Sequence, residues 1–199
     1  MEMNFYRAAL LAVTIFFVGC DEAPKPAQTT QPATVLEGKT MGTFWRVSAV
    51  GVDAKRAGEL QAKIQAQLDA DDQLLSTYKN DSALMRFNLS KSLSPWPVND
   101  AMADIVTSAL RIGAKTGGAM DITVGPLVNL WGFGPDQQPV HIPTQAQIDA
   151  AKAQTGLSHL KVVNEAHRNY LQKDLPELYV DLSTVGEGYA ADHLARLME

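Results

Sequence analysis

The chain has 199 residues, 46% of them hydrophobic, with a formal net charge of −5 at pH 7 and a single cysteine. The mildly acidic charge and the lack of a basic cluster argue against nucleic acid as a partner, and one cysteine excludes both an internal disulfide and a cysteine-built zinc cluster. Beyond an atypical N-terminal stretch, roughly 165 residues remain, enough for one domain with a hydrophobic core.

The first twenty residues have the pattern of a secretory signal. Arg7 is followed by an apolar run over residues 8–18 and then by Gly19 and Cys20, and such a segment is too short to span a bilayer as a mature helix. Residues 17–20, FVGC, resemble the lipobox of bacterial lipoproteins, with Phe in the place of the usual Leu. The resemblance implies that Cys20 becomes the lipid-modified first residue. An ordinary signal peptide with an incidental cysteine is the alternative.

Residues 21–34 differ in composition from the rest of the chain. They are rich in Pro, Thr, Gln and Ala and have no periodicity. Such a segment is typical of a flexible linker. We therefore expect a tether between the membrane and a domain that begins at residue 35.

The first half of that domain is predicted to start with two strands, residues 34–39 and 43–50, since apolar and polar residues alternate there. A helix follows from about Asp53, which can cap it. Asn80 or Asp81 is expected to cap a short helix that ends near Phe87. The predicted buried stripe of the first helix comprises Leu60, Ile64, Leu68 and Leu75.

A third helix is expected to begin at its cap Asn99 and to stop at Gly117 and Gly118 in a left-handed turn. Residues 119–134, AMDITVGPLVNLWGFG, favour an apolar strand that runs into a loop punctuated by Gly and Pro. The core face of this third helix is expected to consist of Met102, Ile105, Val106 and Ala109.

In the last third of the chain, Thr144 and Gln147 form a capping box for a helix that should stop at Gly156. Strands are predicted over residues 160–163, 169–172 and 177–182, and a final helix from about Gly186. Because strands and helices are mixed without βαβ alternation, the fold class is α+β, with helices packed on a mixed sheet.

Residues 186–191, GEGYAA, fit the G-x-G-x-x-A fingerprint of dinucleotide-binding turns, and they open a predicted helix. A nicotinamide-binding Rossmann domain is therefore one interpretation. The match is incomplete, because three residues separate the preceding strand from Gly186, and because Glu187 would repel a bare pyrophosphate.

A bound cation would remove that repulsion. Mg²⁺ is typically shared between protein oxygens and phosphate oxygens, and the hydroxyl of Thr184 is a suitable hard ligand. Alternatively, Asp181 and Glu187 accept hydrogen bonds from polar groups of a ligand. In the simplest interpretation, Ser183 and Thr184 only cap the helix, and Glu187 lies in its first turn, where the helix dipole favours an acid.

Five segments together resemble one family, the FAD:protein FMN transferases or ApbE-type lipoproteins, and they occur in the family's order over almost the whole mature chain. They are KTMGT (residues 39–43), LSTY (75–78), GAMDIT (118–123), GPL (125–127) and DLSTVGEG (181–188). The family's fold is thus expected here, with the second half of the family's domain, including its Asp-rich magnesium motif and its histidine, missing from this chain.

The resemblance also implies site residues. Thr184 matches a magnesium-ligand position, and no catalytic residue is identified in this portion. His141, His159, His167 and His193 share no ligand spacing and are assigned no role. The positions that match the family's flavin contacts are Met41, Tyr78, Ala119, Met120, Asp121, Asp181 and Glu187; the methionines could instead be core fillers, Tyr78 a half-buried aromatic, and Asp121 a cap.

By this resemblance the protein is a Mg²⁺-dependent transferase that cleaves its substrate FAD, attaches FMN to a threonine of a target protein and releases AMP. The expected partners are exported subunits of redox complexes, and the expected location is the periplasmic side of the cell inner membrane, through a lipid anchor. A lipoprotein that binds or hydrolyses FAD without modifying a protein is the alternative.

Overall fold

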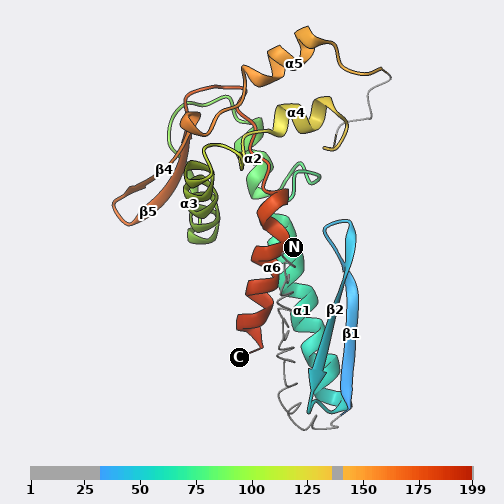
Figure 1. The fold of residues 1–199 in the computed structure, drawn as a ribbon. Coiled ribbons are helices and arrows are strands. Elements are labelled where there is room, and N and C mark those ends of the chain that lie inside the picture. Colours follow the sequence, from blue (N-terminus) through green and yellow to red (C-terminus); the bar gives the residue numbers. More distant parts are fainter. Residues whose placement is uncertain (1–31, 136–140, 199) are drawn as a thin grey trace, which may run out of the picture. The chain divides into compact units, whose positions relative to one another are not determined.

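The computed structural model describes residues 32–135 and 141–198. The predicted signal peptide, Cys20 and nearly all of the predicted tether lie outside these residues. Ala33–Glu199 forms one compact unit, shown as a ribbon in Figure 1. Within the described part of the chain, no helix is both long and apolar enough to cross a membrane.

The unit begins with a β-hairpin. Strands β1 (Ala33–Thr40) and β2 (Thr43–Val50) pair antiparallel, with Thr40 opposite Thr43, so that Met41 and Gly42 form a two-residue turn. Both turn residues have positive φ, 48° and 75°, as a twist-compatible hairpin turn requires. Glycine adopts this conformation freely, whereas for Met41 it costs roughly 1–2 kcal/mol. The predicted strands are thus confirmed, and their connection is strained.

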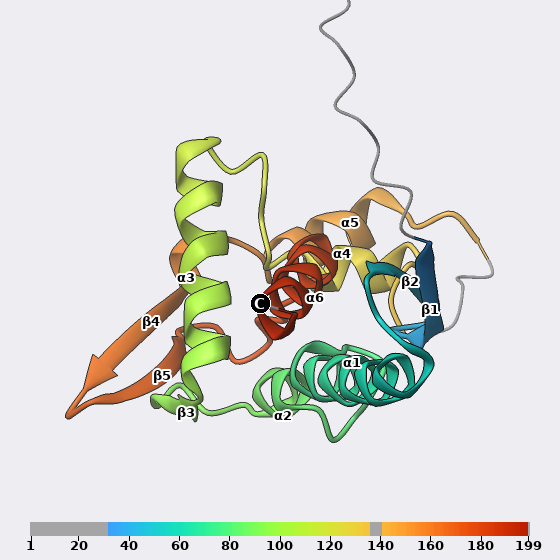
Figure 2. The same ribbon diagram turned by 90° about the horizontal axis from the view of Figure 1, so that it is seen from below.

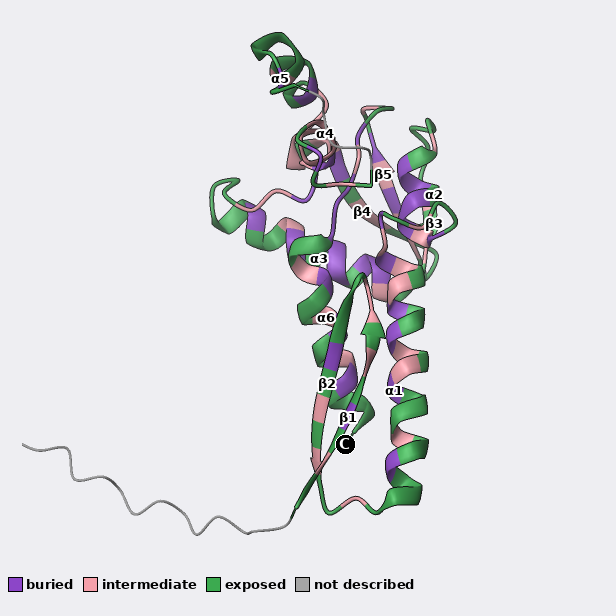
Figure 3. Cartoon of the chain, turned by 90° about the vertical axis from the view of Figure 1, so that its right-hand side faces the viewer, coloured by how far each residue is buried: buried purple, intermediate pink, exposed green. Residues whose placement is uncertain are grey.

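Helix α1 (Ala54–Leu75) packs along this hairpin and against α6 (Ser183–Leu197). Asp53 caps it as predicted, by accepting a hydrogen bond from the backbone N–H of Arg56. Figure 3 shows the buried residues recurring along one side of α1. The smaller hydrophobic cluster joins these three elements and comprises Leu36, Trp45, Ala57, Ile64, Leu68, Ala190 and Leu194.

Helix α2 (Ala83–Leu89) is capped by Ser82, so the prediction that Asn80 or Asp81 caps it was wrong. Helix α3 (Asp100–Lys115) has the predicted cap Asn99, and its four predicted core residues are buried. It also stops as predicted. Gly117 and Gly118 have φ of 64° and 85°, and the N–H of Gly118 donates to the carbonyl of Gly113 at 2.8 Å, which closes the helix end.

Three strands form a second sheet, in the order β3-β5-β4. Strands β4 (Leu160–Glu165) and β5 (Arg168–Lys173) form a hairpin, and β3 (Trp96–Val98) pairs with β5. Helix α3 packs against β4 and β5, as Figure 2 shows. The larger cluster joins α3 and this sheet to the end of α1, to α2 and to the segments before α4 and α6; it comprises Leu75, Leu84, Phe87, Met102, Ile105, Val106, Ala109, Ile122, Leu160, Leu171, Leu178, Val180 and Leu182.

Two predicted strands are not found. In residues 119–134 the structure has helix α4 (Gly125–Leu130) instead, because Pro126 has a fixed φ and no N–H, which suits the first turn of a helix and not a strand. Residues 177–182 are not a strand either. The side-chain amide of Asn88 both donates to and accepts from the backbone of Val180 at 2.8 Å, and so satisfies groups that a neighbouring strand would otherwise pair.

The capping box of helix α5 (Gln145–Lys152) is confirmed, but the helix ends four residues before Gly156, which instead precedes the 3-10 helix η1 (Leu157–His159). Helix α6 begins three residues before the predicted Gly186. The α+β class is confirmed. A sheet of mixed direction was expected, whereas all strand pairs in the described residues are antiparallel.

Candidate functional site

A cavity of about 630 Å³ lies where the β1–β2 turn, the C-terminal end of α1 with the residues after it, and the N-terminal end of α6 meet. These segments are far apart in the sequence and are brought together by the packing of α1 against the hairpin and α6. The walls are formed by Met41, Gly42, Asp72, Leu75, Ser76, Thr77, Tyr78, Lys79, Leu182, Ser183, Gly186 and Glu187.

Three of the predicted flavin contacts line this cavity. Met41 is half-buried and packs against the smaller cluster, so it is a core contact and a wall residue at once. Tyr78 is 66% exposed, and its hydroxyl donates to the backbone carbonyl of Phe133 at 3.1 Å. Its ring is therefore held at the rim of the cavity and is not a core aromatic. Glu187 is exposed in the first turns of α6.

The start of α6 differs from the simplest interpretation of the sequence. The cap position is Leu182, whose side chain makes no capping hydrogen bond, and Ser183 and Thr184 are the first residues of the helix itself, so the interpretation that they cap it was wrong. Both hydroxyl side chains are exposed in the first turn. Ser183 lines the cavity, whereas Thr184 does not.

Asp181 does not line the cavity. It is 8% exposed, and its Oδ1 accepts a hydrogen bond from the backbone N–H of Ser183 at 2.8 Å. Asp121 adopts the same kind of local turn, in which Oδ1 accepts from the N–H and the hydroxyl of Thr123 at 2.7 and 2.6 Å. The two aspartates lie on adjacent segments, because the N–H of Asp181 donates to the carbonyl of Ile122 at 2.8 Å.

Ala119 and Met120 do not line the cavity either. Ala119 is exposed, while Met120 packs partly against the larger cluster. The predicted site residues therefore fall into two groups. One is the cavity wall with Met41, Tyr78 and Glu187, and the other is the paired segments 119–121 and 181–184. Leu182 and Ser183 join the two groups, since they belong to the second group's segment and line the cavity.

The cavity wall also contains an ion pair that was not predicted from the sequence. Lys79 Nζ lies 2.7 Å from Asp72 Oδ2, and this hydrogen bond raises the pKa of Lys79 above its ordinary value, so the ammonium stays charged. Among the wall residues, Lys79 is the one cation beside two acids, Asp72 and Glu187. Lys79 directly follows the LSTY motif, and this position could have indicated that it belongs to the site.

We tested whether the described residues fit the expected Mg²⁺. They contain no group of three or more His, Cys, Asp or Glu side chains arranged to hold a metal ion. Mg²⁺ requires a nearly octahedral shell of oxygens, and the hydroxyl of Thr184 would be a single ligand. The described residues alone therefore do not fit a magnesium site.

Comparison with known proteins shows the family of the chain. Residues 41–199 match the model of the ApbE family. The whole chain is 76% identical to the FAD:protein FMN transferase of Escherichia coli strain K12 and covers 57% of it. The enzyme of the same name from Vibrio cholerae serotype O1 is 39% identical over 95% of this chain, which covers 54% of that protein.

Solved structures give the same result. The flavin transferase ApbE from Vibrio cholerae superimposes with a TM-score of 0.78 at 41% identity, over 84% of this chain and 54% of that one. The apo form of the Pseudomonas stutzeri flavinyl transferase ApbE has a TM-score of 0.73 at 34% identity, over 84% of this chain and 52% of that one. The chain thus spans little more than half the length of the relatives it matches, and it belongs to the ApbE family.

Proposed function

We propose that this protein is a Mg²⁺-dependent FAD:protein FMN transferase. The observation that carries the proposal is the cavity with Met41, Tyr78 and Glu187 on its walls, in a chain 76% identical to a protein named for that activity. Its volume of about 630 Å³ is in the range typical of small-molecule sites. The apolar side chains of Met41, Leu75 and Leu182 suit a flavin ring, and Tyr78 can stack on it from the rim.

In the proposed reaction, the hydroxyl oxygen of a threonine in a target protein attacks the FMN phosphorus of FAD. The bond between that phosphorus and the bridging oxygen breaks, AMP leaves with the bridging oxygen, and the hydroxyl proton passes to a base that these residues do not identify. Phosphoryl transfer depends mostly on positioning and on neutralising charge. Met41 and Tyr78 would orient the flavin, while Lys79, paired with Asp72, would offset part of the negative charge of the wall.

The magnesium ion would neutralise the developing charge on the pyrophosphate. Thr184 would give it one oxygen, and the remaining ligands would be phosphate oxygens, waters and residues other than those described. Because the described residues do not complete such a site, we derive no step that passes through the metal.

The experiment is to incubate the full natural protein with FAD, Mg²⁺ and an exported redox subunit that carries an acceptor threonine. AMP release is measured by chromatography, and protein-bound flavin by in-gel fluorescence and mass spectrometry. If the protein is a transferase, the amount of AMP released should equal the amount of covalent FMN. A target in which the acceptor threonine is replaced by valine should carry no covalent FMN. AMP and free FMN without labelled target would contradict transfer and favour the alternative, hydrolysis of FAD.

We also propose that the protein is anchored through a lipid on Cys20 to the periplasmic side of the inner membrane. The supporting observation is the FVGC segment after an apolar run. Cells fed a radiolabelled fatty acid should label the natural protein and not Cys20→Ser. Label on the Cys20→Ser protein would refute the anchor.

A further inference from the structure

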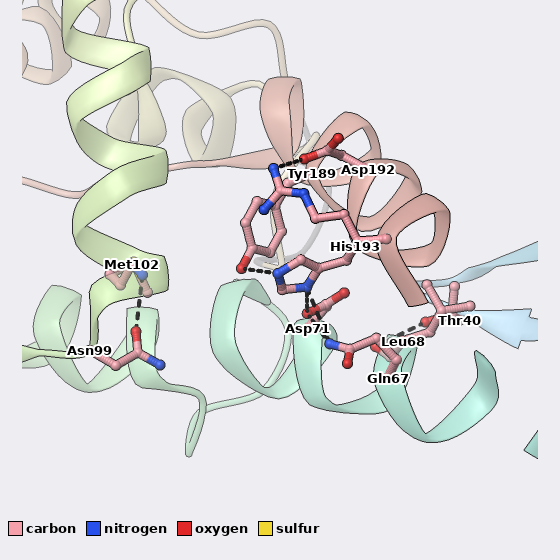
Figure 4. Close-up of polar contacts among 10 residues, drawn as sticks. Thr40, Gln67, Leu68, Asp71, Asn99, Met102, Tyr189, Asp192 and His193 are labelled. Atoms are coloured by element: carbon pink, nitrogen blue, oxygen red, sulfur yellow. Dashed lines mark hydrogen bonds and ion pairs between the residues drawn. The ribbon is translucent and has the colours of Figure 1, made fainter. Parts of the chain in front are cut away.

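A chain of hydrogen bonds joins α1 to α6 (Figure 4), and on α1 it begins at Asp71, directly before the cavity-wall residue Asp72. His193 of α6 lies between two residues: its Nδ1 is 2.9 Å from Oδ1 of Asp71 on α1, and its Nε2 is 3.0 Å from the hydroxyl of Tyr189, one turn earlier on α6. The rings of Tyr189 and His193 also contact each other, with centroids 4.3 Å apart.

The partners fix which groups donate. An ionised Asp71 can only accept, so Nδ1 of His193 carries the proton, and in the neutral ring Nε2 then accepts from the hydroxyl of Tyr189. Gln67 Nε2 donates to the same Asp71 oxygen at 3.0 Å. Burial, and to a smaller extent the charge of Asp71, raises the pKa of Tyr189, so its hydroxyl remains a donor. Gln67 Nε2 also lies 3.2 Å from Nδ1 of His193, so Gln67, Asp71 and His193 form one polar cluster that Tyr189 extends.

Stability alone is a poor explanation for Asp71. The residue is 2% exposed, and its Oδ2 is buried without a hydrogen-bond partner among the described residues. A buried acceptor that lacks a partner costs roughly 1–3 kcal/mol. In some proteins, buried charged groups of this kind fix one specific arrangement of the chain and add little net stability.

Asp71, Tyr189 and His193 lie close in sequence to residues of the cavity walls, so their hydrogen bonds can fix how the walls are placed. On α1, Asp71 is followed by the wall residues Asp72 and, one turn later, Leu75. On α6, Tyr189 comes two residues after Glu187. The helices are in contact beside the cavity, since a Cβ placed on Gly186 would lie 3.9 Å, an ordinary van der Waals distance, from Cδ1 of Leu75. A change in the spacing of α1 and α6 at His193 would therefore move one wall relative to the other.

We propose that His193 is a positioning residue of the flavin site. By bonding Asp71 and Tyr189 it sets the spacing of α1 and α6, and thereby the place of Glu187 relative to Tyr78, which follows the end of α1. This inference rests on the proposed function, because the site that His193 positions is the proposed FAD site.

The test uses the full natural protein with His193→Ala, Tyr189→Phe and the double variant. His159→Ala is the matched control, because His159 also bonds an aspartate, Asp174, through Nδ1 at 2.7 Å but lies away from the cavity. FAD affinity is measured by flavin fluorescence well below each unfolding temperature. Independently of FAD, hydrogen exchange is measured on the peptide that covers residues 183–188.

We expect His193→Ala to weaken FAD binding about tenfold, which corresponds to one or two lost hydrogen bonds, and to speed exchange in residues 183–188. Tyr189→Phe should have a smaller effect of the same kind. The double variant should be no worse than His193→Ala, because the hydroxyl of Tyr189 acts through His193. His159→Ala should change neither measurement.

Lower unfolding temperatures with unchanged FAD affinity and unchanged exchange would overturn the inference, since His193 would then only stabilise the fold. Additive effects in the double variant would also overturn it. If His193→Ala does not fold, the milder Tyr189→Phe decides by the same two measurements. If the natural protein binds no FAD, the proposed function fails, whereas hydrogen exchange still decides whether His193 orders the start of α6.

Discussion

Lys173 offers a test of how the segment that leads to the site is held. It is the last residue of β5 and is 1% exposed, with Nζ 3.2 Å from the carbonyl of Leu178 and 3.4 Å from those of Phe87 and Asn88. The ammonium also lies 5.1 Å from the centroid of the Phe87 ring. Lys173 thus attaches the residues before Asp181 to the end of α2.

The energetic consequence follows from the pKa. Burial, followed by repulsion from Lys91, lowers the pKa of Lys173 from 10.5 to about 8, a difference that corresponds to about 3 kcal/mol. Below pH 8 both folded and unfolded chains carry the proton. Between about pH 8 and 10.5 the unfolded chain binds it more strongly, so this group makes stability rise with pH across that window. Above pH 10.5 its contribution is constant.

Lys173→Met keeps most of the side-chain volume and removes the titration. At pH 7 the gain from removing a buried charge is offset by the loss of the donor to Leu178, so the net change should be small. The free energy of unfolding is measured by urea unfolding, followed by tryptophan fluorescence, at pH 7.5 and at pH 10. Between these two pH values it should rise by up to about 3 kcal/mol more for the natural protein than for Lys173→Met. Parallel pH dependences would refute the reasoning.

Three further predictions concern the cavity. Tyr78→Ala should weaken FAD binding roughly threefold to tenfold in a fluorescence titration, whereas Tyr78→Phe, which keeps the ring and loses only the hydrogen bond to Phe133, should weaken it less. Met41→Gly should leave the free energy of unfolding within about 1 kcal/mol, because relief of the left-handed strain offsets lost packing, while FAD affinity falls; a large loss of stability would contradict this. Thr184→Ala should lower Mg²⁺-dependent transfer at least about tenfold with an unchanged unfolding temperature, and Thr184→Ser should retain activity; equal loss in both variants would exclude the hydroxyl as the cause.

Local signals in the sequence predicted most of the fold correctly. The caps Asp53, Asn99 and Thr144 each accept from a backbone N–H three positions away, so they could be recognised without knowledge of the packing. The predicted strand over residues 177–182 failed for the opposite reason. The segment has the apolar pattern of a strand, but the backbone of Val180 bonds the side chain of Asn88, 92 residues earlier. No local pattern contains that information.

The same distinction applies to the site. Met41, Tyr78 and Glu187 lie within sequence motifs, and the structure brings them to one cavity. His193 was assigned no role because histidine spacing was the only criterion, whereas its carboxylate partner Asp71 lies 122 residues away. The cavity residues could be predicted because they belong to sequence motifs. The contact between His193 and Asp71 could not, because it exists only once α1 and α6 are packed side by side.

The two acids near the start of α6 have different explanations in the structure. Asp181 is buried and accepts a hydrogen bond from the backbone N–H of Ser183, at a helix N-terminus where negative charge is favourable. Glu187 instead faces the cavity, whose wall carries two carboxylates and one ammonium, with Lys79 already paired to Asp72. A pyrophosphate that entered this wall unaccompanied would meet net negative charge. The acid pattern that argues against a bare dinucleotide site is therefore also the reason that we propose a cation to accompany FAD.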